Sequence, residues 1–181
     1  MHTLVADRSR VVIEVSAAGL LAAAAHDLRI AAGGASGESA DGGVFVARFP
    51  VRELSVAESR RHGTRAWHAP SSSDANDIEG RIRTQVLAGG DVITVEGTLE
   101  DDRATLVVRA PGGEQRVVTK VTLERTDDEV RVRGACDLSL RALGTGRVQI
   151  PFGAVKLQDI IRVEFDVVAR AERKTPPVLE P

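Results

Sequence analysis

Histidines and their neighbours are the first candidates for chemistry. His26 stands beside Asp27 at the start of a predicted strand, and His62 and His68 flank Trp67 in a long predicted loop. A zinc site needs three or four ligands on rigid elements. Two histidines on a loop do not provide that, so we expect no metal site. His26 is then either a polar side chain directed into the interior or a structural histidine hydrogen-bonded to a turn.

Nucleophilic side chains are few. Ser71–Ser73 lie close in sequence to His68 and Asp74, which together are the residue types of a hydrolytic triad. They share one loop, without the strained turn and oxyanion donors that such a nucleophile needs. Cys136 falls on the apolar face of a predicted strand, where burial makes a thiol inert. We therefore expect a protein that is not an enzyme.

The segment from Arg48 to His68 is rich in arginine and is predicted to be the longest loop. Its guanidinium groups could pair with an anionic head group, and its one tryptophan could cover the path of an apolar chain into a cavity. A solvated surface loop is the alternative, because most charged runs lie on the surface. The candidate head-group residues are Arg60, Arg61, Arg65, Trp67 and His26.

The composition excludes several classes of protein. The chain has 181 residues, a formal net charge of −2 and 3% aromatic residues, so it lacks both the basic surface and the stacking side chains that bind nucleic acid. Its single cysteine excludes an internal disulfide. We expect one domain over residues 1–172 and a disordered tail over 173–181.

The N-terminal region can be interpreted in two ways. Basic residues before an apolar run, followed by Ala17–Ala25, resemble a signal peptide. Glu14 interrupts that run, and Val11, Ile13 and Val15 follow the alternation of a half-buried strand. The run is also far shorter than the ~20 residues that span a bilayer. We expect a first strand, no integral membrane segment and a cytoplasmic protein.

A period of two dominates the chain and predicts about eight short strands. Acidic and glycine pairs between the apolar runs predict tight hairpin turns, and the Gly/Ser stretch 33–43 is predicted to be a connection. The segment 51–56 is either a continuation of the strand before it or a further strand. The other predicted strands cover 11–16, 27–32, 43–49, 92–99, 104–109, 116–125, 130–141 and 160–170.

One segment has a helical period instead. Ile78, Ile82 and Val86 fall four residues apart, which predicts an amphipathic helix over about 74–88. Ser73 or Asp74 would cap its N-terminus, and the Gly-Gly pair at 89–90 would end it.

Each predicted strand has one consistently apolar face. Such faces must avoid water, so we expect them to converge inside a closed antiparallel barrel. An eight-stranded barrel is either just filled by side chains or holds one small ligand, and both interpretations stay open. The residues expected to contact a ligand inside are Val11, Ile13, Val15, Leu28, Ile30, Phe45, Ile93, Val95, Leu106, Val108, Val121, Leu123, Val132, Cys136, Leu138 and Phe165.

Several segments together carry a family resemblance. They are 25–28 (AHDL), 95–99 with its return strand to Val108, 138–144 (LSLRALG), Val148, 151–157 (PFGAVKL) and 159–167 (DIIRVEFDV). In these segments, and in the order of its elements, the chain resembles the bacterial YceI-like family over most of its length. The resemblance implies an extended, lipocalin-like barrel that binds amphiphiles with long isoprenoid tails, such as polyprenyl phosphates or isoprenoid quinones.

The leading hypothesis is a mainly β protein, a single lipocalin-like barrel of about eight strands with one helix. It would bind an isoprenoid-type lipid and need no cofactor, because removing the lipid chain from water supplies the driving force. Two alternatives remain open. One is a solidly packed barrel that acts through its surface, and the other is a small-molecule enzyme that uses His26 or the Arg48–His68 loop. The identity of the ligand and a homodimeric state are left open as well.

Overall fold

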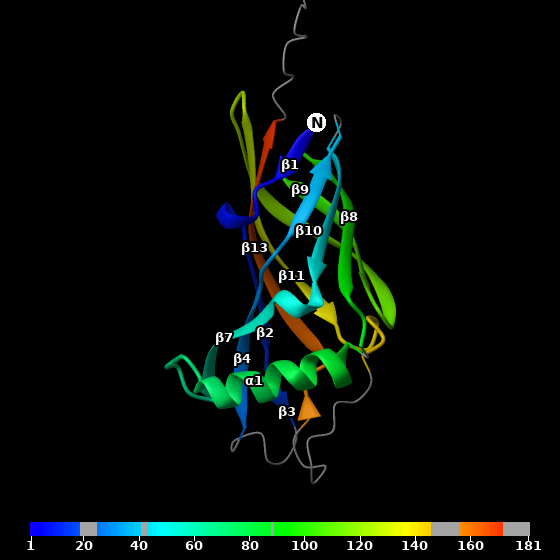
Figure 1. Cartoon of the computed structure of the whole chain (residues 1–181). Helices are drawn as coiled ribbons and strands as arrows, with labels where there is room; N and C mark the ends of the chain where they lie inside the picture. Colours follow the sequence, from blue (N-terminus) through cyan, green and yellow to red (C-terminus); the bar gives the residue numbers. More distant parts are fainter. Residues whose placement is uncertain (19–24, 41–42, 88, 146–155, 172–181) are drawn as a thin grey trace, which may run out of the picture.

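The computed structural model describes residues 1–18, 25–40, 43–87, 89–145 and 156–171. Within them the chain is mostly β-structure, with one helix lying across an end of the barrel (Figure 1). The described strands are β1 (His2–Leu4), β2 (Arg10–Val15), β3 (Ala17–Ala18), β4 (His26–Ala32), β5 (Ser36–Ser39), β6 (Val44–Pro50), β7 (Leu54–Arg61), β8 (Val92–Glu100), β9 (Arg103–Ala110), β10 (Gly113–Arg125), β11 (Glu129–Ser139), β12 (Lys156–Leu157) and β13 (Ile160–Ala171). The helix α1 (Ser72–Arg81) continues into a π-helical turn at Ile82–Val86.

The main sheet closes on itself. Its hydrogen-bonded order is β1-β5-β6-β8-β9-β10-β11-β13, and β1 also pairs with β13, which completes an antiparallel ring of eight strands among the described residues. In the same sheet β13 pairs with β2, β2 with β4 and β4 with β7. These three strands lengthen the barrel toward α1 (Figure 1). The predicted single antiparallel barrel is therefore confirmed.

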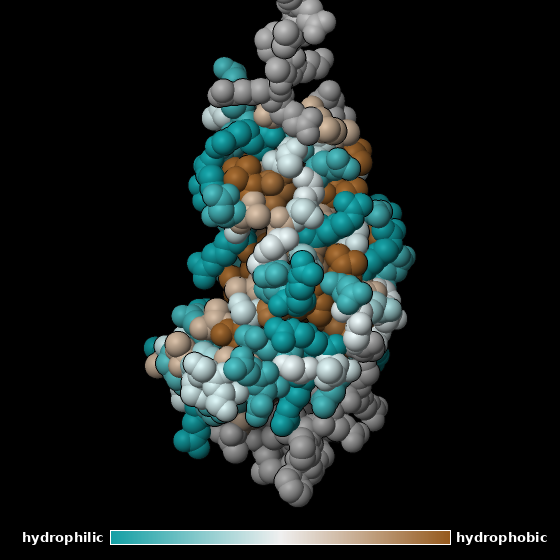
Figure 2. Space-filling model, viewed as in Figure 1, coloured by the Kyte–Doolittle hydropathy of each residue, from teal (hydrophilic) through white to brown (hydrophobic). Residues whose placement is uncertain are grey.

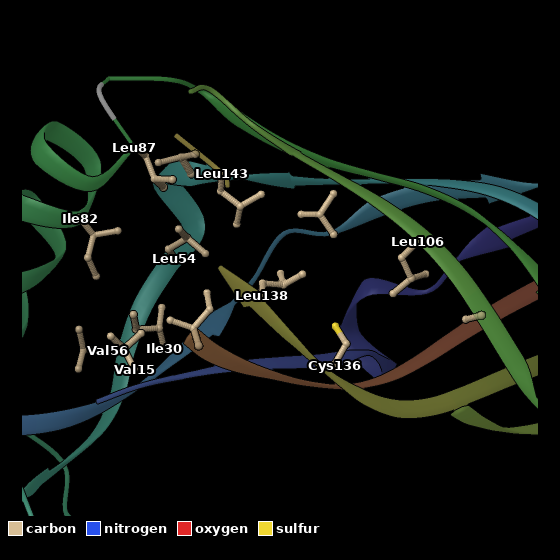
Figure 3. Packing of buried hydrophobic residues seen from close by; sticks show 14 of the residues in the cluster. Val15, Ile30, Leu54, Val56, Ile82, Leu87, Leu106, Cys136, Leu138 and Leu143 are labelled. Atoms are coloured by element: carbon tan, nitrogen blue, oxygen red, sulfur yellow. The ribbon is translucent and has the colours of Figure 1, made fainter. Parts of the chain in front are cut away.

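Alternation along the strands separates the interior from the outer surface. On β11, Cys136 and Leu138 are buried in the core. Arg131 and Arg133, of the opposite parity, form ion pairs with Asp166 on the neighbouring β13. One large hydrophobic cluster surrounds the interior toward α1, and Figure 3 shows its side chains pointing inward from several strands.

Among the described strands, β1, β3, β5 and β12 were not predicted, and β7 was predicted only in part, by the alternative of a further strand at 51–56. The strand β5 lies in the Gly/Ser stretch 33–43, and β7 lies in the predicted Arg48–His68 loop. The sequence of β5, SGES, has no apolar side chain, so its strand conformation depends on backbone pairing with β1 and β6. In β7 the charged side chains that suggested a loop lie on the outer face of the strand. A register shift opposite β4 also breaks the alternation of apolar and polar side chains along β7. The prediction of one long loop is wrong for Leu54–Arg61.

The helix exists where it was predicted, but its cap differs. The N-cap is Ser71, whose Oγ accepts a hydrogen bond from the Asp74 backbone N–H at 3.2 Å. The prediction of Ser73 or Asp74 is therefore wrong. Ser71 has the acidic residue three positions later that a capping box requires, which explains why it starts the helix. In the described parts of the chain, no helix is both long and apolar enough to span a membrane.

The π-helical turn directs the end of the helix into the barrel. The Leu87 backbone N–H donates to the Ile82 carbonyl at 2.9 Å, a five-residue step that widens the helix. Both of these side chains are buried in the main cluster, and Val86 packs against it. The wider turn thus brings three apolar side chains to one face, where a regular α-helix would separate them further.

The helix also satisfies the free edge of β7. On that edge the Val56 N–H donates to Glu79 Oε1 at 3.0 Å, and Arg83 Nη2 lies 3.5 Å from the Leu54 carbonyl oxygen. Glu79 and Arg83 pair with each other at 3.2 Å. Because an open strand edge leaves backbone groups without partners, these two side chains take the place of a neighbouring strand.

Replacing Glu79 by alanine should therefore destabilise the fold. The variant loses the acceptor for the Val56 N–H and the partner of Arg83, and we expect the free energy of unfolding to fall by about 1–2 kcal/mol. Chemical denaturation measures it. Asp77→Ala is the matched control, because Asp77 is an exposed acidic residue of the same helix. Equal stability of the two variants would contradict the proposed role of Glu79.

Candidate functional site

The interior of the barrel contains an elongated cavity of ≈ 280 Å³. Its lining extends along β13 from Ile161 to Ala169, a separation of roughly 26 Å at the usual rise per residue of a strand. A water molecule takes up about 30 Å³, so the cavity holds much more than one or two waters. The solidly packed barrel, one of the two interpretations of the sequence, does not fit this volume.

The predicted interior residues largely form the wall of this cavity. Two of the predicted residues do not reach it: Val121 is buried in the surrounding core, and Leu123 on the same strand, β10, is only partly buried. The predicted residues that do line the cavity are Val11, Ile13, Val15, Leu28, Ile30, Phe45, Ile93, Val95, Leu106, Val108, Val132, Cys136, Leu138 and Phe165.

Two glycines make room for two of the three phenylalanine side chains that line the cavity. Gly97 is the cross-strand partner of Phe45, and Gly134 is that of Phe165. A Cβ atom would lie 2.9 Å from the Phe45 ring at Gly97 and 2.7 Å from the Phe165 ring at Gly134. Each ring thus occupies the space above a glycine, against the wall. A larger residue at either glycine would displace the ring.

The end of the cavity beside α1 is closed by aliphatic side chains. Ile82, Leu87 and Leu143 gather there, while Cys136 and Leu106 lie further along the interior (Figure 3). Leu143 follows β11 in a turn, so strand periodicity did not identify it. The helical period did mark Ile82 as apolar, but nothing in the sequence placed the helix across a barrel end.

Polar side chains are rare in the cavity wall. The polar residues that border it are His2, Glu38, Ser39 and Thr145, of which Glu38 has an exposed side chain on the opposite face of β5 from Ser39. The Thr145 hydroxyl donates to the Leu140 carbonyl oxygen at 2.6 Å, so it is already satisfied. The other three lie on β1 and β5, where His2 and Ser39 are direct cross-strand partners. None of them was predicted, because two short polar strands carry no apolar alternation.

Cys136 is part of the wall and not a nucleophile. Burial raises the pKa of its thiol to about 11, with a smaller contribution from the nearby Asp137 carboxylate. Near neutral pH the group is therefore a thiol, and the thiolate is the reactive form. This placement agrees with the expected buried, inert cysteine.

A polar cluster lies on the outside of the barrel at the α1 end. At its centre is Asp27, only 1% exposed. Its Oδ1 hydrogen-bonds with His62 Nδ1 at 2.7 Å and accepts from the Ala17 N–H at 3.1 Å, and its Oδ2 accepts from Arg60 Nε at 3.1 Å. Burial alone would raise the pKa of Asp27, but the hydrogen bonds from His62, the Ala17 N–H and Arg60 outweigh it and hold the pKa below its ordinary value.

Trp67 is the second anchor of this cluster. Two guanidinium groups lie over its ring, with the Arg29 carbon 4.2 Å and the Arg60 carbon 4.3 Å from the ring centre. Arg29 also pairs with Glu14 and Glu58. Cation–π contacts of this kind hold the loop after β7 against the outer wall.

The structure places the predicted head-group residues apart from the cavity. Arg60 and Trp67 contact each other on the outer wall, Arg61 and Arg65 are exposed, and His26 is exposed with its ring 6.4 Å from that of His68. None of the five lines the cavity. Their role in binding a head group stays a prediction, and Arg60 already has protein partners for its charge.

The structure also places the residues that the sequence suggested for a catalytic triad or a metal site. The Ser71 hydroxyl caps α1 and donates to Asp74 Oδ2 at 2.7 Å, so it is not arranged as a triad nucleophile. His68 lies beside Ser59, with Nε2 3.4 Å from its Oγ. Across the described ranges, no group of three or more His, Cys, Asp or Glu side chains is arranged to hold a metal ion.

Asp27→Asn should lower the stability of the protein at neutral pH by about 2–3 kcal/mol, because it weakens a buried, charge-assisted network. The pKa of Asp27 is lower in the folded state, so its contribution is present above the unfolded value of about 3.9 and is lost as the pH falls through the folded value. The difference between wild type and variant should therefore shrink in acid. Denaturation curves at pH 7 and pH 3 measure it.

Asp137→Asn serves as the control for this measurement. Asp137 is an exposed carboxylate whose nearest cation, Arg162, lies 3.8 Å away, and such surface pairs contribute little. If Asp27→Asn were no more destabilising than this control at pH 7, the network would not hold the loop.

The outer surface contrasts with the interior. Figure 2 shows a mainly hydrophilic face, with hydrophobic side chains visible only between hydrophilic strips. A chain that buries its apolar side chains around a long cavity and covers its outside with ion pairs has the general form of a binding barrel.

Comparison with known proteins supports the barrel fold. No protein-family model matches the sequence, and no curated protein matches it. Among solved structures, a polyisoprenoid binding domain from Saccharophagus degradans, implicated in plant cell wall breakdown, matches with a TM-score of 0.65 and 11% identity, over 94% of this chain and 98% of that chain. BcnA of Burkholderia cenocepacia matches with a TM-score of 0.61 and 11% identity, over 91% of this chain and 98% of that one. The chain thus has the barrel fold of these two proteins along nearly its whole length.

Proposed function

We propose that this protein binds one elongated, apolar amphiphile of the isoprenoid type inside its barrel. The observation that carries the proposal is the cavity, which runs along the barrel between aliphatic walls. The S. degradans domain, which shares the barrel fold, is a polyisoprenoid binding domain. A ligand of the same class suits this cavity. A branched aliphatic chain matches walls made mainly of valine, leucine and isoleucine.

The hydrophobic effect alone can drive such binding. Removing about 400 Å² of apolar lipid surface from water contributes roughly 10 kcal/mol before the costs of association. No catalytic group is needed for this. Of the polar groups in the wall, the Cys136 thiol is protonated near neutral pH and the Thr145 hydroxyl is already bonded to the Leu140 carbonyl oxygen.

The enzyme alternative has weaker support. Its candidate residues lie outside the cavity, where His26 is exposed and Arg60 is engaged with Asp27 and Glu14. The surface-interaction alternative requires a filled interior, and the cavity volume counts against it. Binding is therefore the function that the geometry supports best.

Filling the cavity should abolish binding without changing the outer surface. Cys136→Phe adds a ring in the middle of the wall, and we expect the affinity for a long-chain polyprenol to fall at least about tenfold, because the ring takes the volume that the lipid needs. Co-elution of radiolabelled polyprenol with the protein in gel filtration measures the affinity.

Val118→Phe is the matched control, because Val118 is 57% exposed on the outer face of β10. It adds the same ring outside the barrel and should bind polyprenol like the wild type. If a folded Cys136→Phe protein bound polyprenol as tightly as Val118→Phe, the lipid would not lie in the cavity. Failure of the wild type to bind any isoprenoid, together with a lipid-free solvent extract of the purified protein, would refute the proposed function itself.

A further inference from the structure

The two ends of the cavity differ in polarity. At the end beside α1, apolar side chains from the helix and the turn after β11, including Ile82, Leu87 and Leu143, close the interior. At the opposite end, His2 on β1 and Ser39 on β5 stand opposite each other in the wall. An amphiphile has one apolar end and one polar end, so this difference sets its direction.

The polar pair at the β1–β5 end is available to a ligand. Among the hydrogen bonds between described residues, none involves the side chain of His2 or Ser39, whereas Thr145 near the other end is satisfied by Leu140. Both side chains can donate hydrogen bonds. A head group at this end that carries an oxygen acceptor would find partners that the closed end lacks.

The described residues that line the cavity include no arginine or lysine, and the charged groups around its β1–β5 end are of both signs. The turns between β8 and β9 and between β10 and β11 lie at this end, and Glu38 borders the cavity beside them with an exposed side chain on the opposite face of β5 from Ser39. Among the described residues, seven carboxylates stand here against four arginines, Lys120 and the N-terminal amino group. The acidic residues are Glu38, Glu100, Asp101, Asp102, Asp127, Asp128 and Glu129, and the arginines are Arg8, Arg103, Arg125 and Arg170.

The arginines at this end are partly neutralised. Arg8 forms two hydrogen bonds to Glu129, at 2.5 and 2.9 Å, and Arg170 lies 3.9 Å from the same carboxylate. The positive charges of Arg8 and Arg170 are therefore directed at the Glu129 carboxylate. A phosphate or pyrophosphate placed in the cavity at this end would find no arginine or lysine among the described residues of the wall, and burying its charge without such a partner costs binding free energy.

We infer that the ligand lies with its polar head at the β1–β5 end, beside His2 and Ser39, and that the protein selects isoprenoids with an uncharged head, such as a prenol or a quinone, over prenyl phosphates. This inference rests on the proposed function and adds to it the orientation and the class of ligand. It differs from the head-group site predicted from the sequence, which involved Arg61 and Arg65 near α1.

Competition binding tests the selectivity. The displacement of radiolabelled polyprenol from the full-length protein by unlabelled polyprenol, isoprenoid quinone and polyprenyl phosphate of the same chain length gives three affinities. We expect the two neutral lipids to compete about tenfold better than the phosphate at low salt, and the difference to narrow at high salt as the charges are screened. Equal or tighter binding of the phosphate would overturn the inference.

A charge-matched pair of variants locates the effect. Glu38→Lys changes the charge at the β1–β5 end, and Asp77→Lys makes the same change on the exposed side of α1. Glu38→Lys should reduce the preference for the neutral lipids about threefold, and Asp77→Lys should leave it unchanged. The reverse pattern, or equal effects, would place the head group elsewhere.

Loss of the polar pair tests the orientation. His2→Ala and Ser39→Ala should weaken the binding of prenol and quinone but not that of squalene, an isoprenoid without a head group. Arg61→Ala and Arg65→Ala should change none of the three affinities, for prenol, quinone or squalene. If the arginine variants altered head-group preference and the His2 and Ser39 variants did not, the head would lie at the α1 end. In that outcome wild-type binding of prenol, and with it the proposed function, would still stand.

Discussion

An antiparallel sheet that closes into a ring must bury one entire face, and in this protein the side chains on that face are too small to fill the space. Most of them are valine, leucine, isoleucine and alanine. The two phenylalanines that could plug the centre, Phe45 and Phe165, lie over Gly97 and Gly134 at the wall. The cavity is thus a consequence of the closed hydrogen-bonded ring and of a shortage of large side chains, and every functional statement depends on it.

Much of the barrel could be predicted because burial on one face leaves an alternation that is readable in the sequence. The long strands β8 to β11 and β13 carry that alternation clearly, and they were predicted nearly in full. The sequence of β5 carries none, because its pairing with β1 and β6 depends on backbone hydrogen bonds and not on side chains. The charged side chains on the outer face of β7 led to the prediction of a loop, because they hid the alternation of that strand. Local pattern therefore revealed the long strands with regular alternation and missed β5, while in β7, which buries Leu54 and Val56, charged residues and a register shift obscured the alternation.

The same limit applies to the site. Its aliphatic wall could be predicted, since any inward-facing side chain of a barrel is a wall residue. The polar features could not, because each depends on partners distant in sequence: Asp27 and Arg60 are 33 positions apart, and Trp67 stacks on arginines from two strands. Those contacts draw the arginine-rich segment onto the outer wall. The polar end of the cavity is formed instead by residues of the short strands β1 and β5.

A crystal structure of the protein with a bound long-chain polyprenol tests the central claim most directly. The account predicts continuous density for one extended lipid chain inside the barrel, passing Cys136 and ending near Ile82 of the π-helical turn. Density for the lipid only on the outer surface, or an interior in which side chains have closed the cavity, would contradict it.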